Sequence, residues 1–414
     1  MNDHWKSVAL SEICSVSAGN SAPQDPTYFA EGTIPFFRTS DAGRVKFGTI
    51  YESQDKLNPR GASKLRRYPA GTILFPKSGA STFLNHRVVL GVEGCVSSHL
   101  ATIVPNLNHV LPQFLLYALT LIDAKDLIQD QSYPSLNLPA IEKIHIKLPP
   151  LAEQQRIVRL LDEAFEGIAI AKANAENNLQ SARLIFENYL QTVFQQAGVE
   201  SVTAAIDDER HITQLQHLCD NYKQDIVDGP FGSNLKREDY VSEGVPVLKI
   251  QNVKPLRIEL KKMDYVSPDK FRDLQRHSFL RGDIIMTKLG DPLGVSAIVN
   301  HLEEGVIVAD LVRIRAAKIN TKFLCYQLNS PVVKRFINAK QKGTTRPRVT
   351  LSVVRELPIY SPPLAEQIRI VTELDQLLLS VESLIASYAK KKTALDDLKI
   401  SLLNKLFSGY LDAA

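Results

Sequence analysis

The 414-residue sequence predicts an α+β protein in which two similar mixed α/β modules are separated by two long antiparallel coiled-coil helices. Two observations lead to this fold class. The hexamer PPLAEQ occurs at 149–154 and again at 362–367, which indicates an internal repeat. After each copy, apolar and small residues recur at alternating intervals of four and three, a spacing typical of coiled coils. A pseudo-twofold arrangement of the two repeats is therefore expected.

The repeat extends well beyond the hexamer. The stretch LPAIEKIHIKLPPLAEQ at 138–154 aligns with LSVVRELPIYSPPLAEQ, 213 residues later. Upstream, EGTIPFFRTSD at 31–41 resembles EGVPVLKIQN at 243–252. The predicted boundaries are 1–148 for the first module, 149–197 for the first long helix, 198–211 for a linker, 212–361 for the second module, 362–408 for the second long helix and 409–414 for a C-terminal tail.

Each predicted module contains short β-rich runs. VPVLKI, DIIMTK, GVIVAD and TILF are four to six residues long, and Gly, Pro, Asn and Asp separate them from their neighbours. The Pro-Pro pair at the end of each module closes the last of these elements and precedes text with helical spacing. Each module is therefore a mixed α/β unit that leads directly into a helix.

The two helices are predicted to pair along a seam in identical register. The proposed seam comprises Ile157, Leu161, Ile168, Asn178 and Ile185 in the first helix, and Ile370, Leu374, Val381, Lys391 and Leu398 in the second. Asn178 and Lys391 are its polar positions and lie 213 residues apart. A polar seam residue can fix helix register at a cost in stability. The alternative is that the seam is locally loose and both side chains are solvated.

Composition limits the classes of protein that this chain can belong to. A hydrophobic content of 44% is sufficient for a buried core in each module, and the net charge of +4 is only mildly basic. The four cysteines are scattered singly, which fits a reducing cytoplasm better than a disulfide framework or a zinc site. No signal peptide and no long apolar span is recognised, so we expect a cytoplasmic protein without membrane contact.

Sequence motifs argue against catalysis by this chain. No glycine loop ends in GK[ST], so the sequence gives no sign of a nucleotide-dependent motor. The Pro-Pro pairs lack the Asn or Asp and the aromatic residue expected of an amino-methyltransferase, and the Pro268-Asp269 pair has the wrong spacing for a metal-dependent nuclease. The histidines, His145 and His211 among them, show no metal-ligand spacing. The sequence therefore predicts a chain with no catalytic residues and no metal site.

Clusters of basic residues favour nucleic-acid binding instead. The run 331–350 holds six Lys or Arg residues and no acid, and two further clusters occur at 44–67 and 254–281. Loops after predicted strand ends also combine side chains that suit phosphates with side chains that suit bases. The candidate DNA-binding residues are Arg38, Ser40, Asp41, Lys77 and Ser78 in the first module, and Lys249, Gln251, Asn252, Lys288, Arg346 and Arg348 in the second.

The order of module and helix, with IHIKLPPLAEQQRIVRLLD and LPIYSPPLAEQIRIVTELD at the two junctions, resembles the DNA-specificity subunit of type I restriction–modification enzymes. The resemblance covers essentially the whole chain. It implies that each module is a target-recognition domain for one half of a bipartite site in double-stranded DNA, and that the helices set the spacer. It also implies two modification (methyltransferase) subunits and two restriction (translocase) subunits as partners, with S-adenosylmethionine, ATP and Mg²⁺ bound by those partners.

One departure from a simple repeat concerns the basic run. Where the second module has residues 331–350, the first has ALTLIDAKDLIQDQSYPSLN at 118–137, with one Lys and three Asp. The two modules are therefore not expected to contact DNA in the same way in this region. Two alternatives remain open at this point: a coiled-coil scaffold whose modules bind proteins, and the specificity subunit of a related two-part restriction enzyme.

Overall fold

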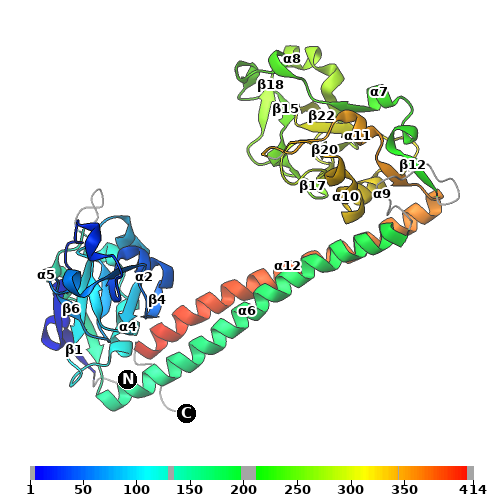
Figure 1. Ribbon diagram of the computed structural model, residues 1–414. Helices are drawn as coiled ribbons and strands as arrows, with labels where there is room; N and C mark the ends of the chain where they lie inside the picture. The colour runs from blue at the N-terminus through cyan, green and yellow to red at the C-terminus, as the bar shows by residue number, and fades with distance from the viewer. Residues whose placement is uncertain (1–4, 129–134, 197–210, 344, 408–414) are drawn as a thin grey trace. The chain divides into compact units, whose positions relative to one another are not determined.

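The internal repeat reappears as two units in the computed structural model, which describes residues 5–128, 135–196, 211–343 and 345–407 (Figure 1). The first unit combines residues 1–175 with 390–414, and the second spans 176–389. Each unit therefore takes part of both long helices, α6 (Leu151–Gln196) and α12 (Leu364–Phe407). Residues 198–210 of the predicted linker and the predicted tail at 409–414 lie outside the described residues.

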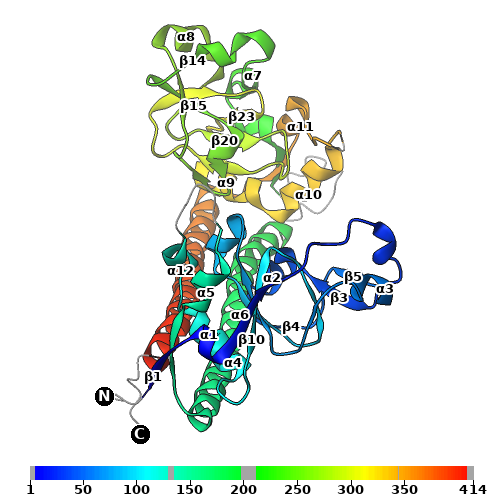
Figure 2. The same cartoon turned by 90° about the vertical axis from the view of Figure 1, so that its left-hand side faces the viewer.

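The first unit is built around two sheets. The larger sheet has the order β2 (Cys14–Ala18), β10 (Leu100–Pro105), β7 (Ile73–Pro76), β8 (Arg87–Leu90) and β4 (Phe47–Ile50), and the smaller has the order β5 (Asp55–Leu57), β3 (Ile34–Phe37), β9 (Gly94–Val96) and β6 (Arg67–Tyr68). Figure 2 shows β3 and β5 beside the sheet that contains β4 and β10. Phe37 and Val96 of the smaller sheet share a hydrophobic cluster with Leu74 and Val88 of the larger.

Shorter elements complete the first unit. β1 (Lys6–Ala9) pairs antiparallel with β11 (His145–Leu148), so the beginning of the module lies beside the strand that leads into α6. Pro149 and Pro150 follow β11, and because proline cannot continue a strand ladder, the chain leaves the sheet and starts the helix. The shorter helices are α1 (Leu10–Ile13), α2 (Thr39–Val45), α3 (Pro59–Ala62), α4 (Pro112–Thr120) and α5 (Leu138–Glu142).

The second unit repeats the central strand order of the first, but the sheets differ at their edges. One sheet has the order β13 (Ile226–Asp228), β23 (Leu311–Ile314), β20 (Ile284–Thr287) and β21 (Ser296–Ile298), and the other has the order β14 (Tyr240–Val241), β18 (Asp264–Val266), β15 (Val245–Leu248), β22 (Glu304–Ile307) and β19 (Ser278–Leu280). β12 (Ile212–Gln214) pairs with β24 (Pro358–Tyr360) as β1 pairs with β11. The remaining elements are β16 (Val253–Lys254), β17 (Arg257–Ile258), α7 (Tyr222–Asp225), α8 (Pro268–Asp273), α9 (Thr321–Asn329), α10 (Pro331–Lys340) and α11 (Leu351–Arg355). The repeat therefore preserves the central topology, whereas β4 at the edge of one sheet and β14 at the edge of the other have no counterpart in the strand order of the opposite unit over the described residues.

The long helices contribute to the hydrophobic core of each unit. In the first unit, Ile157 of α6 and Leu403 of α12 belong to the same cluster as the buried residues of α4. The ring of Phe407 packs on Phe114 with the ring centroids 5.0 Å apart. The second unit has the equivalent arrangement, because Phe194 of α6 packs on Phe323 of α9 at 5.5 Å. Sheets and helices are thus parts of one core in each unit.

The two helices run antiparallel within the first unit. The ammonium group of Lys399 lies 4.6 Å from the ring centroid of Phe165, and Lys172 Nζ lies 2.6 Å from Asp396 Oδ1. As α6 advances from 165 to 172, its partners in α12 therefore recede from 399 to 396. In the second unit the Tyr189 hydroxyl is 3.1 Å from Glu373 Oε2.

The seam between the helices keeps the predicted seven-residue spacing, but one of its two stripes departs from the predicted register. In α6, Leu161, Ile168, Ala175 and Ala182 are buried at seven-residue intervals. Leu179 and Phe186 are also buried seven residues apart and belong to a second stripe. This second stripe lies one residue beyond the predicted positions.

This displacement by one residue makes the predicted seam wrong at four positions. Asn178, Ile185, Lys391 and Leu398 are exposed. The remaining predicted positions, Ile157, Leu161, Ile168, Ile370, Leu374 and Val381, are buried. Leu179 and Phe186 lie one residue after Asn178 and Ile185 and are buried in their place. Because Asn178 and Lys391 face solvent, they do not set the register of the pair as a buried polar residue would.

The final glutamine of each PPLAEQ hexamer forms side-chain hydrogen bonds with the backbone near the start of a long helix. Gln154 is fully buried, and its Oε1 accepts a hydrogen bond from Leu111 N at 2.9 Å. Its Nε2 donates to the carbonyls of His109 and Pro149, both at 2.9 Å. Gln367 makes the equivalent bonds to Asn320 N at 2.8 Å and to the Pro362 carbonyl at 2.7 Å. Each glutamine therefore clamps the first turn of a long helix to the loop before α4 or α9.

We expect Gln154→Ala to lower the free energy of unfolding by about 1–3 kcal/mol, because it removes the side-chain partner of the buried Pro149 carbonyl and of the part-buried Leu111 amide and His109 carbonyl. Gln155→Ala is the matched control, since Gln155 is the exposed neighbour in the same helical turn. Denaturant titration followed by circular dichroism measures the difference. Equal effects of the two substitutions would show that the clamp contributes nothing to stability.

Candidate nucleic-acid interface

The candidate residues gather where parallel strands end. β3 and β9 pair in parallel, with Phe37 opposite Val96, and β15 and β22 do the same, with Leu248 opposite Ile307. Neighbouring parallel strands place their carboxyl ends at the same edge of a sheet. The residues that follow these strands, Arg38 and Ser97 in one unit and Lys249 and Val308 in the other, therefore lie at equivalent edges.

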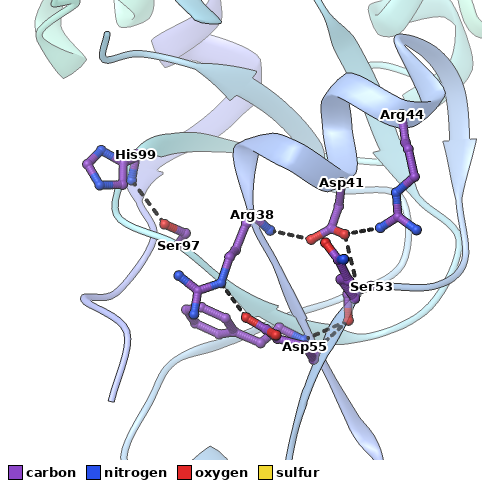
Figure 3. A network of polar contacts seen from close by, with 9 residues as sticks. Arg38, Asp41, Arg44, Ser53, Asp55, Ser97 and His99 are labelled. Atoms are coloured by element: carbon purple, nitrogen blue, oxygen red, sulfur yellow. Dashed lines mark hydrogen bonds and ion pairs between the residues drawn. The ribbon is translucent and has the colours of Figure 1, made fainter. Parts of the chain in front are cut away.

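Arg38 is held at the edge of the first unit by an acid and a ring. Its Nε lies 2.5 Å from Asp55 Oδ2, and its guanidinium carbon lies 5.1 Å from the ring centroid of Phe36. Figure 3 shows Arg38 reaching Asp55 beside the start of α2. Both members of the pair keep 38% of their side-chain surface exposed. Ser40, in the first turn of α2, is exposed as well.

Lys249 occupies the equivalent place in the second unit. It forms an ion pair with Asp264, and its Nζ lies 4.2 Å from the ring centroid of Tyr240. Gln251, two residues later, is exposed, and its Nε2 donates to the Lys262 carbonyl at 3.2 Å. A basic residue, an acid and an aromatic ring therefore recur at the same edge in both units.

Asp41 and Asn252 have a structural role and do not belong to the accessible surface. Asp41 is fully buried and accepts hydrogen bonds from Arg38 N at 2.8 Å and Gln54 N at 3.0 Å (Figure 3). Asn252 is 1% exposed and accepts from Lys249 N at 3.0 Å, while its Nδ2 donates to the Glu259 carbonyl at 2.9 Å. Both side chains cap the turn that follows the strand. The expectation that they face a DNA base is corrected accordingly.

The second predicted loop joins this edge in both units. Lys77 N donates to the His99 carbonyl at 3.1 Å, and Lys288 N donates to the Asp310 carbonyl at 2.9 Å. Ser78 Oγ lies 2.8 Å from His99 Nδ1. Lys77 and Ser78 are half-buried. The backbone thus brings the end of β7 or β20 to the turn that follows β9 or β22.

Lys288 is less available than the other predicted lysines. It is 8% exposed, and its Nζ lies 2.5 Å from Asp228 Oδ2 and 4.7 Å from the ring centroid of Phe231. A charge removed from water in this way is retained where it is paired. Lys288 is therefore a mostly buried part of the edge. It could contact DNA only if its ion pair with Asp228 were broken.

The basic run of the second unit reaches the same edge. Val349 N donates to the Lys288 carbonyl at 3.0 Å, and Arg348 N and Lys342 N each donate to the other residue's carbonyl at 2.9 Å. Arg346 and Arg348 are exposed, and Arg346 Nη2 lies 3.4 Å from Asp310 Oδ2. In the first unit, Leu136 N donates to the Lys77 carbonyl at 2.8 Å in the same manner. Residues 129–134, where part of the corresponding stretch falls, lie outside the described residues.

Several residues of this edge belong to no sequence motif from which their position in the candidate site could be predicted. Asp55, Asp264 and Asp310 pair with predicted basic residues from far along the chain, and His99 lies against Ser78. The internal repeat was the one signal that could have pointed to these residues. When the strand ends of the two repeats are aligned in sequence, Asp55 corresponds to Asp264 and His99 corresponds to Asp310. Pairing across 15 to 40 residues becomes visible only after the sheets are assembled.

The described residues offer little for nucleophilic or metal chemistry. All four cysteines are free, and burial raises the pKa of Cys14, Cys219 and Cys325 to about 12 and that of Cys95 in the same direction, so none is a thiolate near neutral pH. Within the described ranges, His, Cys, Asp and Glu form no group of three or more that could hold a metal ion. None of the described helices is long and apolar enough to cross a membrane.

Two proteins named as specificity subunits are similar to this chain in sequence. The chain is 23% identical to the type I restriction enzyme MjaVIII specificity subunit of Methanocaldococcus jannaschii over 78% of this chain and 75% of that one. It is 21% identical to the EcoBI specificity subunit of Escherichia coli over 100% and 87% of the two chains.

Solved structures give the same fold. One solved structure superposes on this chain with a TM-score of 0.75 at 21% identity, over 98% of each chain. It comes from work on complex assembly and conformational transition of the type I R-M system. The HsdS subunit of Thermoanaerobacter tengcongensis gives a TM-score of 0.58 at 20% identity, over 99% of this chain and 98% of that chain.

A family model matches most of the sequence. The model describes the type I restriction modification DNA specificity domain and matches residues 2–181 and 280–386. The matched residues include Arg38, which follows β3, and Lys288, which follows β20. They also include the basic run at 331–350 and the first turn of both long helices. Because the match covers more than half of the chain, this protein belongs to the family of type I restriction–modification DNA specificity subunits.

Proposed function

We propose that this chain is the non-catalytic DNA-recognition subunit of a cytoplasmic type I restriction–modification complex. Each module reads one half of a bipartite site in double-stranded DNA, and the two long helices set the unread spacer. The observation that carries the proposal is the recurrence of one strand-end edge in both units with different side chains: Arg38 and His99 in the first, Lys249 and Asp310 in the second. Equivalent backbones with different side chains suit two modules that read different bases.

The partners follow from the family. Two modification subunits dock on the helices, and two restriction (translocase) subunits join through the complex. S-adenosylmethionine, ATP and Mg²⁺ belong to those partners, as the resemblance to the family implies. The restriction–modification family favours this function over that of a protein-binding scaffold.

The exposed ion pairs of the edge suit transient contact with phosphates. An exposed pair contributes only about 0–1 kcal/mol to stability. Arg38 can therefore exchange Asp55 for a DNA phosphate, and Arg346 can exchange Asp310, at small cost to the fold. Such contacts position the module, while side chains that face the groove specify the bases.

The function is tested by the DNA that the assembled complex selects. The complex should enrich duplexes from a random library that contain two short defined sequences separated by a fixed number of undefined base pairs. Methylation of the host genome should map to the same pair of sequences. Enrichment of a single continuous sequence, or no enrichment, would contradict a two-module function.

Gln251→Ala should relax base preference in one half-site only. Gln251 is exposed at the edge, and its amide can pair bidentately with adenine, so its loss removes about 1–3 kcal/mol of discrimination at one base pair. The library selection described above measures the change. The half-site of the first module is the internal control. Identical half-sites for the variant and the wild type would exclude a base contact by Gln251.

Arg346→Ala and Arg348→Ala should each weaken DNA binding for all sequences alike. A phosphate contact contributes about 0.9 to the slope of log affinity against log salt, so each substitution should flatten that slope by about one unit. Binding isotherms at several salt concentrations give the slope.

Arg281→Ala is the matched control for these two variants. Arg281 is exposed and pairs with Glu303, which precedes β22 and so lies at the end of that strand opposite to Asp310. An altered base preference with an unchanged slope would show that Arg346 or Arg348 contacts a base instead.

A further inference from the structure

We propose that His99 is a specificity-determining residue of the first module and contacts a base edge through its Nε2 atom. The inference rests on the proposed function and deepens it, because it assigns a reading residue that none of the basic clusters contains. It is carried by the position of His99, by the way its ring is held, and by the residue that takes its place in the second module.

His99 lies in the centre of the strand-end edge. It follows β9 after a two-residue turn in which Leu100 N donates to the Ser97 carbonyl at 3.0 Å. Its own carbonyl accepts from Lys77 N at 3.1 Å, which fixes it to the end of β7. Figure 3 shows the ring beside Ser97, on the same side of the network as Arg38. The backbone of His99 is therefore held from two strands while its side chain is exposed.

One ring nitrogen is already used, and this orients the other. Nδ1 lies 2.8 Å from Ser78 Oγ, and a hydroxyl can either donate to that nitrogen or accept from it. No hydrogen bond to Nε2 is found among the described residues. Nε2 can thus present a donor to guanine N7 or O6 in one tautomer, or an acceptor to an amino group of adenine or cytosine in the other. Holding the ring in advance reduces the entropy lost when it meets a base.

The second module has a different side chain at the same backbone position. Lys288 N donates to the Asp310 carbonyl at 2.9 Å, as Lys77 N does to that of His99, and Leu311 N donates to the Val308 carbonyl at 3.0 Å, as Leu100 N does to that of Ser97. Asp310 presents a carboxylate that lies 3.4 Å from Arg346 Nη2. An imidazole and a carboxylate offer different hydrogen-bonding groups to DNA. This position therefore varies chemically while its backbone does not, as expected of a residue that reads sequence.

The test is the half-site selected by the assembled complex with His99→Ala. We expect relaxed preference at one or two base pairs of one half-site, roughly ten-fold weaker binding to the wild-type site, and an unchanged second half-site. His99→Asp should change the preferred base at the same position, because it replaces the imidazole with an acceptor alone. His145→Ala is the matched control, since His145 is also exposed and its Nδ1 lies 2.8 Å from the Lys143 carbonyl.

Three results would overturn the inference. Both half-sites unchanged in His99→Ala would show that the ring reads nothing. Uniform weakening for all sequences with a flatter salt slope would assign His99 to a phosphate. If His99→Ala fails to assemble, Ser78→Ala keeps the imidazole but releases it, and unchanged selectivity in that variant would overturn the inference as well. Failure of the wild-type complex to select a bipartite site is a separate result, which would overturn the proposed function itself.

Discussion

The packing of the long helices into the hydrophobic core of each unit is the constraint on which the rest of the structure depends. Phe407 against Phe114 and Phe194 against Phe323 insert the last turns of α12 and α6 into the two cores. Gln154 and Gln367 fasten the first turns of the same helices by buried hydrogen bonds. Because each unit holds the beginning of one helix and the end of the other, neither module completes its core without both.

This arrangement separates the parts of the chain that must be constant from those that can vary. The helix junctions are buried, and two equivalent tyrosines, Tyr117 and Tyr326, hydrogen-bond to Asp162 and Asp375 on the long helices. The strand-end edges are accessible and rely on weak exposed ion pairs. Side chains at the edges can therefore change without loss of the fold, as the proposed base-reading role would require.

The repeat, the fold class and the helix starts could be predicted because they depend on local patterns. Pro-Pro before a helix and alternating apolar runs carry their meaning in a few neighbouring residues. The predicted register failed at Asn178 and Lys391 because the apolar pattern alone does not show that one stripe of the seam is displaced by a residue. Asp41 and Asn252 are polar residues that follow strand ends, and the sequence alone does not distinguish a turn-capping residue at such a place from a base-reading one. No sequence pattern marks His99, because its partner Ser78 approaches only when the ends of β7 and β9 are brought together.

The claim that the helices set the distance between two independent readers can be tested by lengthening them. Four residues inserted after Asn177 in α6, and four at the equivalent point after Lys390 in α12, add about 6 Å to each helix at about 1.5 Å per residue. At about 3.4 Å per base pair, the spacer should grow by about one or two base pairs. Mapping methylated positions in DNA modified by the complex with the inserted residues measures spacer and half-sites together. The account predicts a longer spacer with both half-sites unchanged, and an active complex with the original spacer would contradict it.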